Sequence, residues 1–235
     1  MSNEQQADLP YGSPSSDPSN AVYRSQVGGV CFEATEHTDR MSRIADRVAE
    51  AGVRVPDFHE ALMEAGELTV RFRSARERAV AHWNAVTREL VIDPLHGDVR
   101  DDKDRLAGVA LFGILDAASE GERAGWEQYT QPGYADYIDE WAEREGMTAA
   151  GYYGREMERI DFDNVQRHRR IMACLGRAGT GADHLRDLPG DFDSFYAMRC
   201  RPGAGGEAPH VETYRLRYEA LRPGPVVVRQ RGPVD

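Results

Sequence analysis

The residue best placed to do chemistry in this chain is a carboxylate set in the least charged stretch of the sequence. Asp116 lies within the run from Leu106 to Ser119 (LAGVALFGILDAAS), which is apolar nearly all round. Such a run predicts a central, buried helix rather than an amphipathic one. A buried carboxylate is costly unless it is paired or hydrogen-bonded. Asp116 is therefore either a catalytic or ligand-binding group, or a structural carboxylate that ties two helices together.

A second set of polar residues lies on a long helix that we expect from about Thr148 to Leu175. Residues at steps of three and four predict one face of that helix, namely Tyr153, Met157, Ile160, Asn164, His168, Ile171 and Leu175. Asn164 and His168 are its polar members, Asp161 lies beside it, and Glu156 and Glu158 are expected at its rim.

Buried polar groups need partners, and the obvious partner for this face is Asp116. We expect Asp116 to be buried and within hydrogen-bond reach, direct or through water, of Asn164 or His168. Two readings stay open for the set Asp116, Asp161, Asn164 and His168. It is an acid–base or metal cluster, or it is a satisfied hydrogen-bond network between helices.

The remaining histidines show no metal-ligand spacing. His59 and Glu60 are not followed by a second histidine four residues on, as a zinc helix would require. Four more stand in the predicted ribbon or in loops: His82, His96, His184 and His210. Zinc would need ligands assembled from distant segments, so we expect no metal and no cofactor.

Nucleophile and nucleotide motifs are also missing from the sequence. It contains no GxSxG, no P-loop and no GxGxxG, which removes the usual hydrolase, NTPase and dinucleotide-binding interpretations. Cys31 is the best candidate for a cysteine nucleophile, although a buried strand cysteine is the commoner case. Cys31, Cys174 and Cys200 form no CxxC pair, which favours free thiols in a reducing cytoplasm.

The elements that must position these residues predict an α+β fold. It is mainly helical, with a small antiparallel sheet or ribbon in the N-terminal half and a central buried helix. We expect strands at 27–35 and 68–72, and a hairpin of 78–83 and 88–92 with its turn at 84–87. Expected helices cover 38–51, capped by Thr38 or Asp39 and ended by Gly52, then 57–65, 106–119, a segment from Tyr134, 148–175 and 192–198. Residues 211–221 read as a strand or a short helix.

The chain length fits one large domain or two small ones, and we expect a single domain from 21 to 222 between a disordered tail at 1–20 and a flexible tail at 223–235. Its 29 Lys and Arg against 40 Asp and Glu give a net charge of −11, which argues against nucleic acid and anionic membrane surfaces as partners. No signal peptide or membrane-spanning run is visible, which predicts a soluble, cytoplasmic protein. The use of arginine in place of lysine, except at Lys103, fits codon bias in a GC-rich genome.

One family resemblance emerges from the order of these segments. The stretch His82 to Asp93 (HWNAVTRELVID), an acidic spacer and the run 106–119 resemble the core of bacterial zincin-like metallopeptidase domains. In that family an edge ribbon precedes an active-site helix that carries HExxH. The corresponding window here is 112–116, so Phe112 and Asp116 stand at the ligand positions and Gly113 at the general-base position.

The resemblance spans about residues 68–175, and it implies a degenerate scaffold from which the zinc chemistry is gone. Glu156, Glu158 and His168 stand where such families often place a third ligand. We therefore expect a peptide- or protein-binding protein with a bacterial effector or biosynthetic accessory role. The alternative is a small metal-independent enzyme that modifies a peptide by acid–base chemistry at Asp116 and His168.

Overall fold

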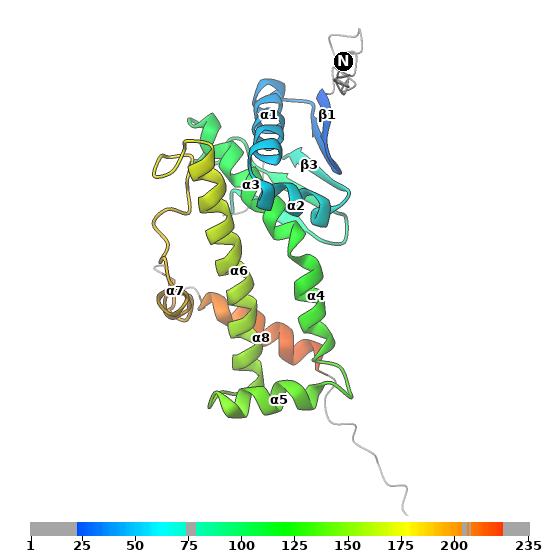
Figure 1. Cartoon of the computed structure of the whole chain (residues 1–235), viewed down its shortest axis with the longest axis vertical. Helices are drawn as coiled ribbons and strands as arrows, with labels where there is room; N and C mark the ends of the chain where they lie inside the picture. Colours follow the sequence, from blue (N-terminus) through cyan, green and yellow to red (C-terminus); the bar gives the residue numbers. More distant parts are fainter. Residues whose placement is uncertain (1–22, 74–78, 204–205, 207, 223–235) are drawn as a thin grey trace, which may run out of the picture. The chain divides into compact units, whose positions relative to one another are not determined.

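The computed structural model describes residues 23–73, 79–203, 206 and 208–222 (Figure 1). The chain forms two compact units, and each takes two separate stretches of sequence. Unit 1 runs to Ala118 and includes Arg167–Arg186, whereas unit 2 comprises Ser119–Gln166 and the chain from Asp187 on. The predicted α+β, mainly helical fold is confirmed. The single domain from 21 to 222 stays a prediction, and the tails predicted at 1–20 and 223–235 lie outside the described residues.

Unit 1 is built on a five-stranded sheet with the strand order β1-β2-β3-β5-β4. Its strands are β1 (Tyr23–Val27), β2 (Val30–Ala34), β3 (Leu68–Phe72), β4 (Ala81–Asn84) and β5 (Glu89–Ile92). The outer pairs β1–β2 and β4–β5 are antiparallel, but β2–β3 and β3–β5 are parallel. The expectation of an antiparallel sheet was therefore incomplete. The chain crosses between β2 and β3 through two helices, and such a crossover brings strands back in the same direction.

The strand expected at 27–35 is the second arm of a hairpin. Gly28 adopts a left-handed backbone with φ 59°, which glycine tolerates, and the chain reverses there between β1 and β2. The hairpin expected farther on is confirmed for β4 and β5. Its turn is held by the Asn84 side chain, which accepts hydrogen bonds from the backbone N–H groups of Val86 and Thr87. The expected start of that hairpin, at 78, lies outside the described residues.

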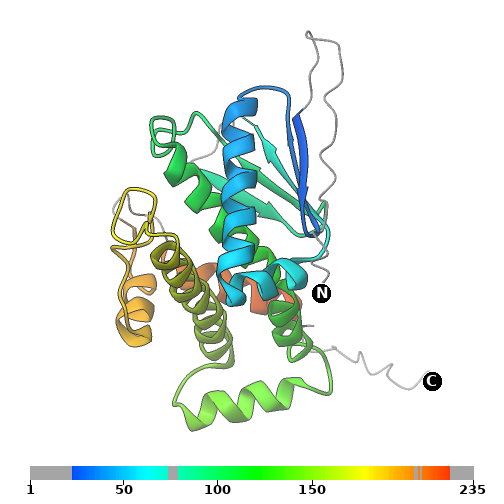
Figure 2. The same cartoon turned by 45° about the horizontal axis from the view of Figure 1, so that its top comes forward.

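Alternation along the strands separates a buried face of the sheet from a polar one. Val30, Phe32, Val70, Leu90 and Ile92 are fully or almost fully buried in the core of unit 1. The opposite face carries a ladder of ion pairs across four strands, formed by Arg24, Glu33, Arg71 and Glu89. Within the described residues, helices pack on the apolar face, and Figure 2 shows α1 lying in front of the strands.

The helices α1 (Thr38–Arg54) and α2 (Pro56–Ala65) confirm the two helices expected before β3. The predicted inner face of α1 is buried, as Met41, Ile44, Ala45 and Val48 show. The predicted N-cap of α1, Thr38 or Asp39, was wrong. The capping position is His37, which has a left-handed backbone and makes no side-chain cap hydrogen bond. Gly52 does not end the helix, which runs on to Arg54, two residues before Pro56.

The central helix of unit 1 is α3 (Lys103–Ala118), and it matches the predicted apolar run. All residues from Leu106 to Leu111 are buried, as are Gly113, Ile114, Leu115 and Ala117. Gly108 permits close approach of another chain segment, since a Cβ at this position would lie 2.2 Å from the Ala182 carbonyl oxygen. The segment that carries Asp183 and His184 is thereby brought against the helix.

Unit 2 is helical throughout the described residues. It contains α4 (Glu120–Gln128), α5 (Ala135–Arg144), most of α6 (Ala149–Cys174), α7 (Phe192–Arg199) and α8 (His210–Leu221). The sequence analysis predicted no helix between 119 and Tyr134, so α4 was missed. The segment 211–221, left open between strand and helix, is helical. Ile138, Tyr153, Met157, Ile160 and Tyr218 form its apolar core.

No helix within the described residues is both long and apolar enough to span a bilayer.

Gly108→Ala tests the close contact between α3 and the segment at Ala182. We expect it to lower the free energy of unfolding by about 2 kcal/mol, because the added methyl meets backbone that a side-chain rotation cannot clear. The matched control is Gly125→Ala in α4, where a Cβ meets nothing within 4 Å. It should raise stability by about 0.5–1 kcal/mol through helix propensity. Urea unfolding measures both changes, and a neutral Gly108→Ala variant would contradict the packing described.

Candidate functional site

The four residues predicted to form one site fall into two pairs. Asp116 and His168 belong to unit 1, whereas Asp161 and Asn164 belong to unit 2.

Asp116 is half-buried, so the expectation of a buried carboxylate was wrong. The reason is that one side of α3 is only partly buried, which the apolar sequence run does not reveal. Arg105, Phe112 and Asp116 are spaced by seven and four residues, and all three are only partly covered. Asp116 thus lies on the least buried side of the central helix.

His168 is fully buried but it does not contact Asp116. Its Nε2 atom lies 3.0 Å from the carbonyl oxygen of Gly108, and its Nδ1 atom lies 3.8 Å from Oδ1 of Asp183. Gly108 precedes Asp116 by eight residues, or about 12 Å along the helix axis. Burial lowers the pKa of His168 to about 4, so the ring is neutral at pH 7. The predicted pairing of Asp116 with His168 is therefore absent from unit 1 as described.

His184 packs beside His168 and shares its environment. The two ring centroids lie 5.1 Å apart, and the edge of each ring meets Phe112. Burial lowers the pKa of His184 to about 3, with His168 and Arg105 lowering it further. The loop histidine that the sequence ranked low is thus part of a buried polar group with Asp183.

The predicted stripe on α6 is confirmed, and Asp161 and Oδ1 of Asn164 have partners on or next to another helix of unit 2, whereas Nδ2 of Asn164 has no hydrogen-bond partner among the described residues. Every residue of the stripe is buried. Asn164 accepts a hydrogen bond of 2.9 Å from the Ser119 hydroxyl at the start of α4. Asp161 binds Arg123 of α4 at 2.9 Å and accepts a hydrogen bond of 2.9 Å from the Tyr214 hydroxyl of α8. For Asp161 and Asn164 the network reading fits the geometry.

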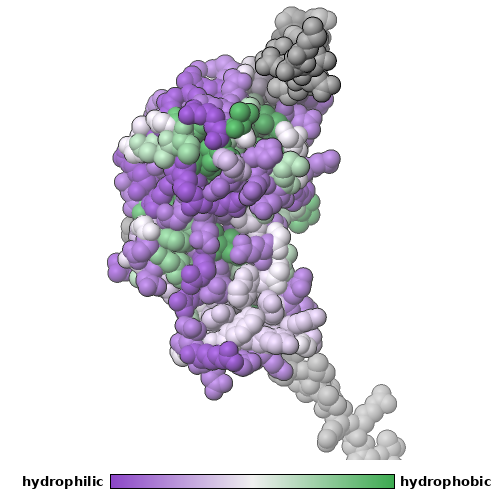
Figure 3. All heavy atoms as spheres, viewed as in Figure 1, coloured by the Kyte–Doolittle hydropathy of each residue, from purple (hydrophilic) through white to green (hydrophobic). Residues whose placement is uncertain are grey.

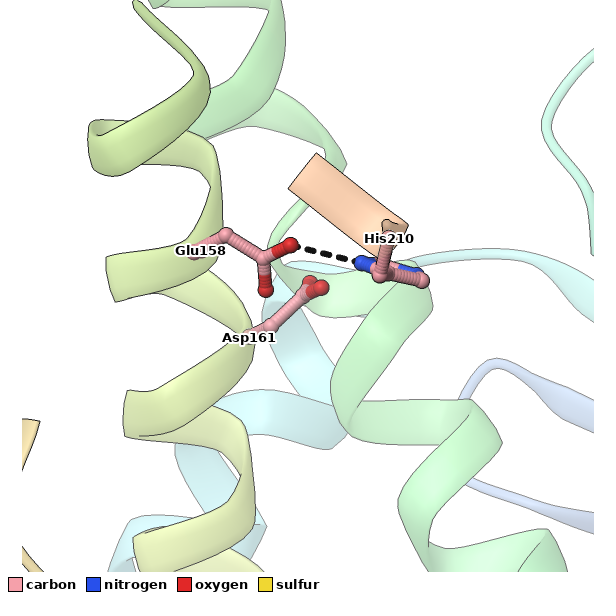
Figure 4. Close-up of side chains that lie close together, drawn as sticks. All are labelled: Glu158, Asp161 and His210. Atoms are coloured by element: carbon pink, nitrogen blue, oxygen red, sulfur yellow. Dashed lines mark hydrogen bonds and ion pairs between the residues drawn. The ribbon is translucent and has the colours of Figure 1, made fainter. Parts of the chain in front are cut away.

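Glu158 is the centre of this network, although the sequence placed it at the rim. Its side chain is completely buried, and Figure 4 shows it on α6, facing His210. One carboxylate oxygen lies 2.6 Å from Nδ1 of His210, and the other lies 2.9 Å from Nε of Arg199. Arg199 also reaches Asp161 at 3.3 Å and Nε2 of His210 at 3.2 Å.

These contacts indicate the hydrogen-bond roles of the two His210 nitrogens. A guanidinium can only donate, so Nε2 accepts from Arg199 and the ring proton lies on Nδ1, where it is donated to Glu158. Both nitrogens of the imidazole are thus engaged. Glu158 and Asp161 supply two negative charges, and Arg123 and Arg199 supply two positive ones.

The set Glu158, Asp161 and His210 has the ligand types of a divalent metal site, with one atom of each residue within 4.8 Å of the others. The geometry nevertheless fits an ion-pair network better. Arg199 occupies the space between the two carboxylates, and a metal ion there would have to displace a guanidinium. The cluster therefore binds α6 to α7 and α8 within unit 2.

The sequence reasoning missed several members of these clusters: Arg123, Asp183, His184, Arg199, His210 and Tyr214. One signal was available, because His210 and Tyr214 are spaced by four residues and share a helix face opposite the acidic positions of α6. It was obscured by the undecided strand or helix at 211–221. Arg123 and Arg199 carried no signal, since arginine is common throughout the chain.

A cluster of aromatic side chains forms the most unusual surface of unit 2. Six rings contact one another in a chain of edge and tilted contacts with centroid distances from 5.2 to 6.4 Å, namely Trp126, Tyr129, Tyr134, Tyr137, Trp141 and Tyr152. None of the six is fully buried, and Tyr134 and Tyr137 are 53% and 49% exposed. We call these six residues the aromatic patch.

The border of the aromatic patch is charged. Helix α5 carries four exposed carboxylates and one arginine, and Glu140 lies about 60° around the helix from Tyr137. Figure 3 shows pale surface of intermediate hydropathy in the region of α5, next to strongly hydrophilic surface. A group of contacting, partly exposed aromatic rings is typical of a docking site, since large aromatic side chains are usually buried in a core or at an interface.

Comparison with known proteins identified no relative. No protein-family model, no curated protein and no solved structure matches the chain. The resemblance to zincin-like metallopeptidases accordingly stays a prediction.

Asp161→Asn tests the ion-pair network. It removes the carboxylate charge that neutralises the buried guanidinium of Arg123, so we expect a loss of about 3 kcal/mol in the free energy of unfolding. Asp163→Asn is the matched control, at an exposed position two residues farther along α6, and should change stability by less than about 0.5 kcal/mol. Urea unfolding of both variants gives the comparison. Equal, small effects would show that the network contributes little.

Tyr153→Phe tests a buried hydroxyl that has no hydrogen-bond partner among the described residues. Burial raises the pKa of Tyr153 from 10 to about 12, with nearby Glu127 contributing. The unfolded chain therefore loses its tyrosine proton first, and the wild-type protein loses stability as the pH rises from 10 to 12. The variant should be as stable as the wild type at pH 7, or more stable by about 1 kcal/mol, and should resist this alkaline loss.

Chemical denaturation at a series of pH values from 7 to 12 measures this difference. Tyr137→Phe, at a half-exposed ring, is the control and should follow the wild type. An alkaline loss of the same size in Tyr153→Phe would refute the assignment.

Proposed function

We propose that this chain is a peptide-binding protein and that the aromatic patch of unit 2 receives an arginine-containing segment of a partner protein. The observation that carries the proposal is the group of six contacting, partly exposed rings beside the acidic helix α5. The rings offer apolar area at a low cost in side-chain entropy, which is the property that peptide-binding surfaces exploit.

The charge of the border favours a cationic ligand. Asp136 and Glu143 have no ionic partner among the described residues, whereas Glu140 pairs with Arg144 on the same helix. A guanidinium can stack on an aromatic face and pair with a carboxylate at the same time. Nucleic acid fits poorly here, since its phosphates would meet the carboxylates of α5.

The chain contains its own example of this mode of arginine binding. Arg222 contacts both carboxylate oxygens of Asp139 on α5, at 3.1 and 2.7 Å. The same guanidinium lies over the ring of Tyr218 and donates a hydrogen bond of 2.9 Å to its hydroxyl. A carboxylate of α5 together with a tyrosine ring is thus a sufficient receptor for arginine.

The observations favour the interpretation as a degenerate binding scaffold over the enzyme alternative. In the zincin-like reading, the ligand position Phe112 carries a phenyl ring and the general-base position Gly113 carries no side chain, which agrees with binding rather than peptide hydrolysis. Acid–base catalysis at Asp116 and His168 has no observation in its favour, because His168 is buried and engaged with Gly108. A bacterial effector or biosynthetic accessory role remains part of the proposal.

Selection from a library of random dodecapeptides displayed on phage tests the proposal. We expect the full chain to enrich peptides that contain arginine, and their affinity to fall as salt rises from 0.05 to 0.3 M because the contacts are partly ionic. Synthetic versions of the enriched peptides should bind Tyr137→Ala and Tyr134→Ala at least about tenfold more weakly, since both substitutions remove exposed stacking surface.

Leu216→Ala is the matched control, because Leu216 is 57% exposed on α8 and lies outside the aromatic patch. It should bind as the wild type does. Enrichment of acidic or purely apolar peptides would overturn the choice of ligand. Equal affinity of the wild type and both tyrosine variants would overturn the choice of site.

A further inference from the structure

Helix α8 brings the last described residue of the chain onto α5, the helix that carries part of the aromatic patch. That residue is Arg222, whose guanidinium binds both carboxylate oxygens of Asp139 and lies over the ring of Tyr218. Figure 1 shows the red end of α8 close to α5. The next residues in sequence, 223–235, therefore start at the surface for which we propose arginine binding.

The side of α5 between Asp139 and the aromatic patch is a strip of carboxylates. Successive residues are turned by about 100° around a helix. Counted from Asp139 in one direction, the angles increase in the order Glu143 (about 40°), Asp136 (about 60°), Glu140 (about 100°) and Tyr137 (about 160°). All of these side chains are exposed. A peptide that leaves the end of α8 on this side thus passes three carboxylates, which we call the acidic strip, before it reaches the rings.

The sequence of residues 223–235 (PGPVVVRQRGPVD) has the composition of a ligand for this surface. It contains Arg229 and Arg231, preceded by three consecutive valines, and its one acidic residue is Asp235. Each guanidinium can pair with a carboxylate and stack on a ring at the same time, and the valines add apolar area. The proposed function calls for an arginine-containing peptide, and the chain itself carries one beside the site.

The connection from Arg222 is long enough to reach the rings. Arg229 follows it by seven residues, which span at most about 23 Å when fully extended. Half the circumference of a helix about 10 Å across is about 16 Å, so the path around α5 from Asp139 to Tyr137 lies within this reach. A tether this short also holds the segment near the site at an effective concentration of about 1 mM.

We propose that residues 223–235 bind to the acidic strip and the aromatic patch of their own chain, with Arg229 and Arg231 as the contacting side chains. The inference rests on the proposed function and adds its regulation, because a partner peptide then binds only by displacing a tethered competitor. At an effective concentration of about 1 mM, a segment with a dissociation constant of about 0.1 mM weakens the binding of a free peptide about tenfold. A second copy of the chain, at micromolar concentration, is a much weaker competitor.

The double variant Arg229→Ser/Arg231→Ser of the full chain tests the proposal. Two of the three tryptophans, Trp126 and Trp141, belong to the aromatic patch, so quenching of tryptophan fluorescence by acrylamide reports how well it is covered. We expect acrylamide to quench the double variant more strongly than the wild type. A fluorescein-labelled peptide with the sequence of residues 223–235 should bind the double variant at least about threefold more tightly than the wild type, as measured by fluorescence anisotropy.

Arg100→Ser/Arg170→Ser is the matched control, because it removes the same charge from two exposed arginines of unit 1 whose ionic partners are also exposed. It should match the wild type in both measurements. The differences between the wild type and the Arg229→Ser/Arg231→Ser variant should be the same at protein concentrations from about 1 to 50 µM, since the segment acts within one chain.

Equal quenching and equal peptide affinity in the wild type and the Arg229→Ser/Arg231→Ser variant would overturn this inference. So would differences that grow with protein concentration, because they would assign the segment to a second copy. The proposed function survives both results if the peptides selected on phage still depend on Tyr134 and Tyr137. Conversely, stronger quenching of the double variant without binding of any free peptide supports the inference and overturns the proposed function.

Discussion

The fold of the described residues depends on one requirement: the buried charged and polar side chains of α6 need ionic or hydrogen-bond partners. Glu158 is completely buried, and an isolated carboxylate in that position would be too costly for a folded chain to keep. Arg199 and His210 satisfy both of its oxygens, and they come from the two helices that follow in sequence. The placement of α7 and α8 within unit 2 is thus dictated by charge as much as by apolar packing.

The same requirement explains which parts of the fold could be predicted. The stripe from Tyr153 to Leu175 was visible because helical periodicity is a local property of the sequence. The hairpin at β4 and β5 was visible because Asn84 begins a turn that needs only its nearest neighbours. The parallel pairing of β3 with β5 was not, since strand direction depends on how the whole sheet is assembled.

The candidate site was predicted only in part, and for a related reason. Asp161, Asn164 and His168 were recognised as buried polar groups, but their partners could not be named. Arg123, Arg199 and His184 become partners through contacts between residues 16 to 38 positions apart, which no spacing rule reveals. Asp116 was overrated because an apolar sequence run does not show that one stripe of α3 is only half covered.

Both units draw on α6, and this has a consequence for how the gene can be divided. The boundary between Gln166 and Arg167 falls inside a continuous 26-residue helix. No contiguous fragment of the coding sequence therefore contains one whole unit without also containing part of the other. Fraying of the helix on one side of that boundary removes hydrogen-bond partners on the other. Loss of helical structure in one unit is thus expected to spread along the α6 backbone into the other unit. We therefore expect the two units to be difficult to produce as separate fragments.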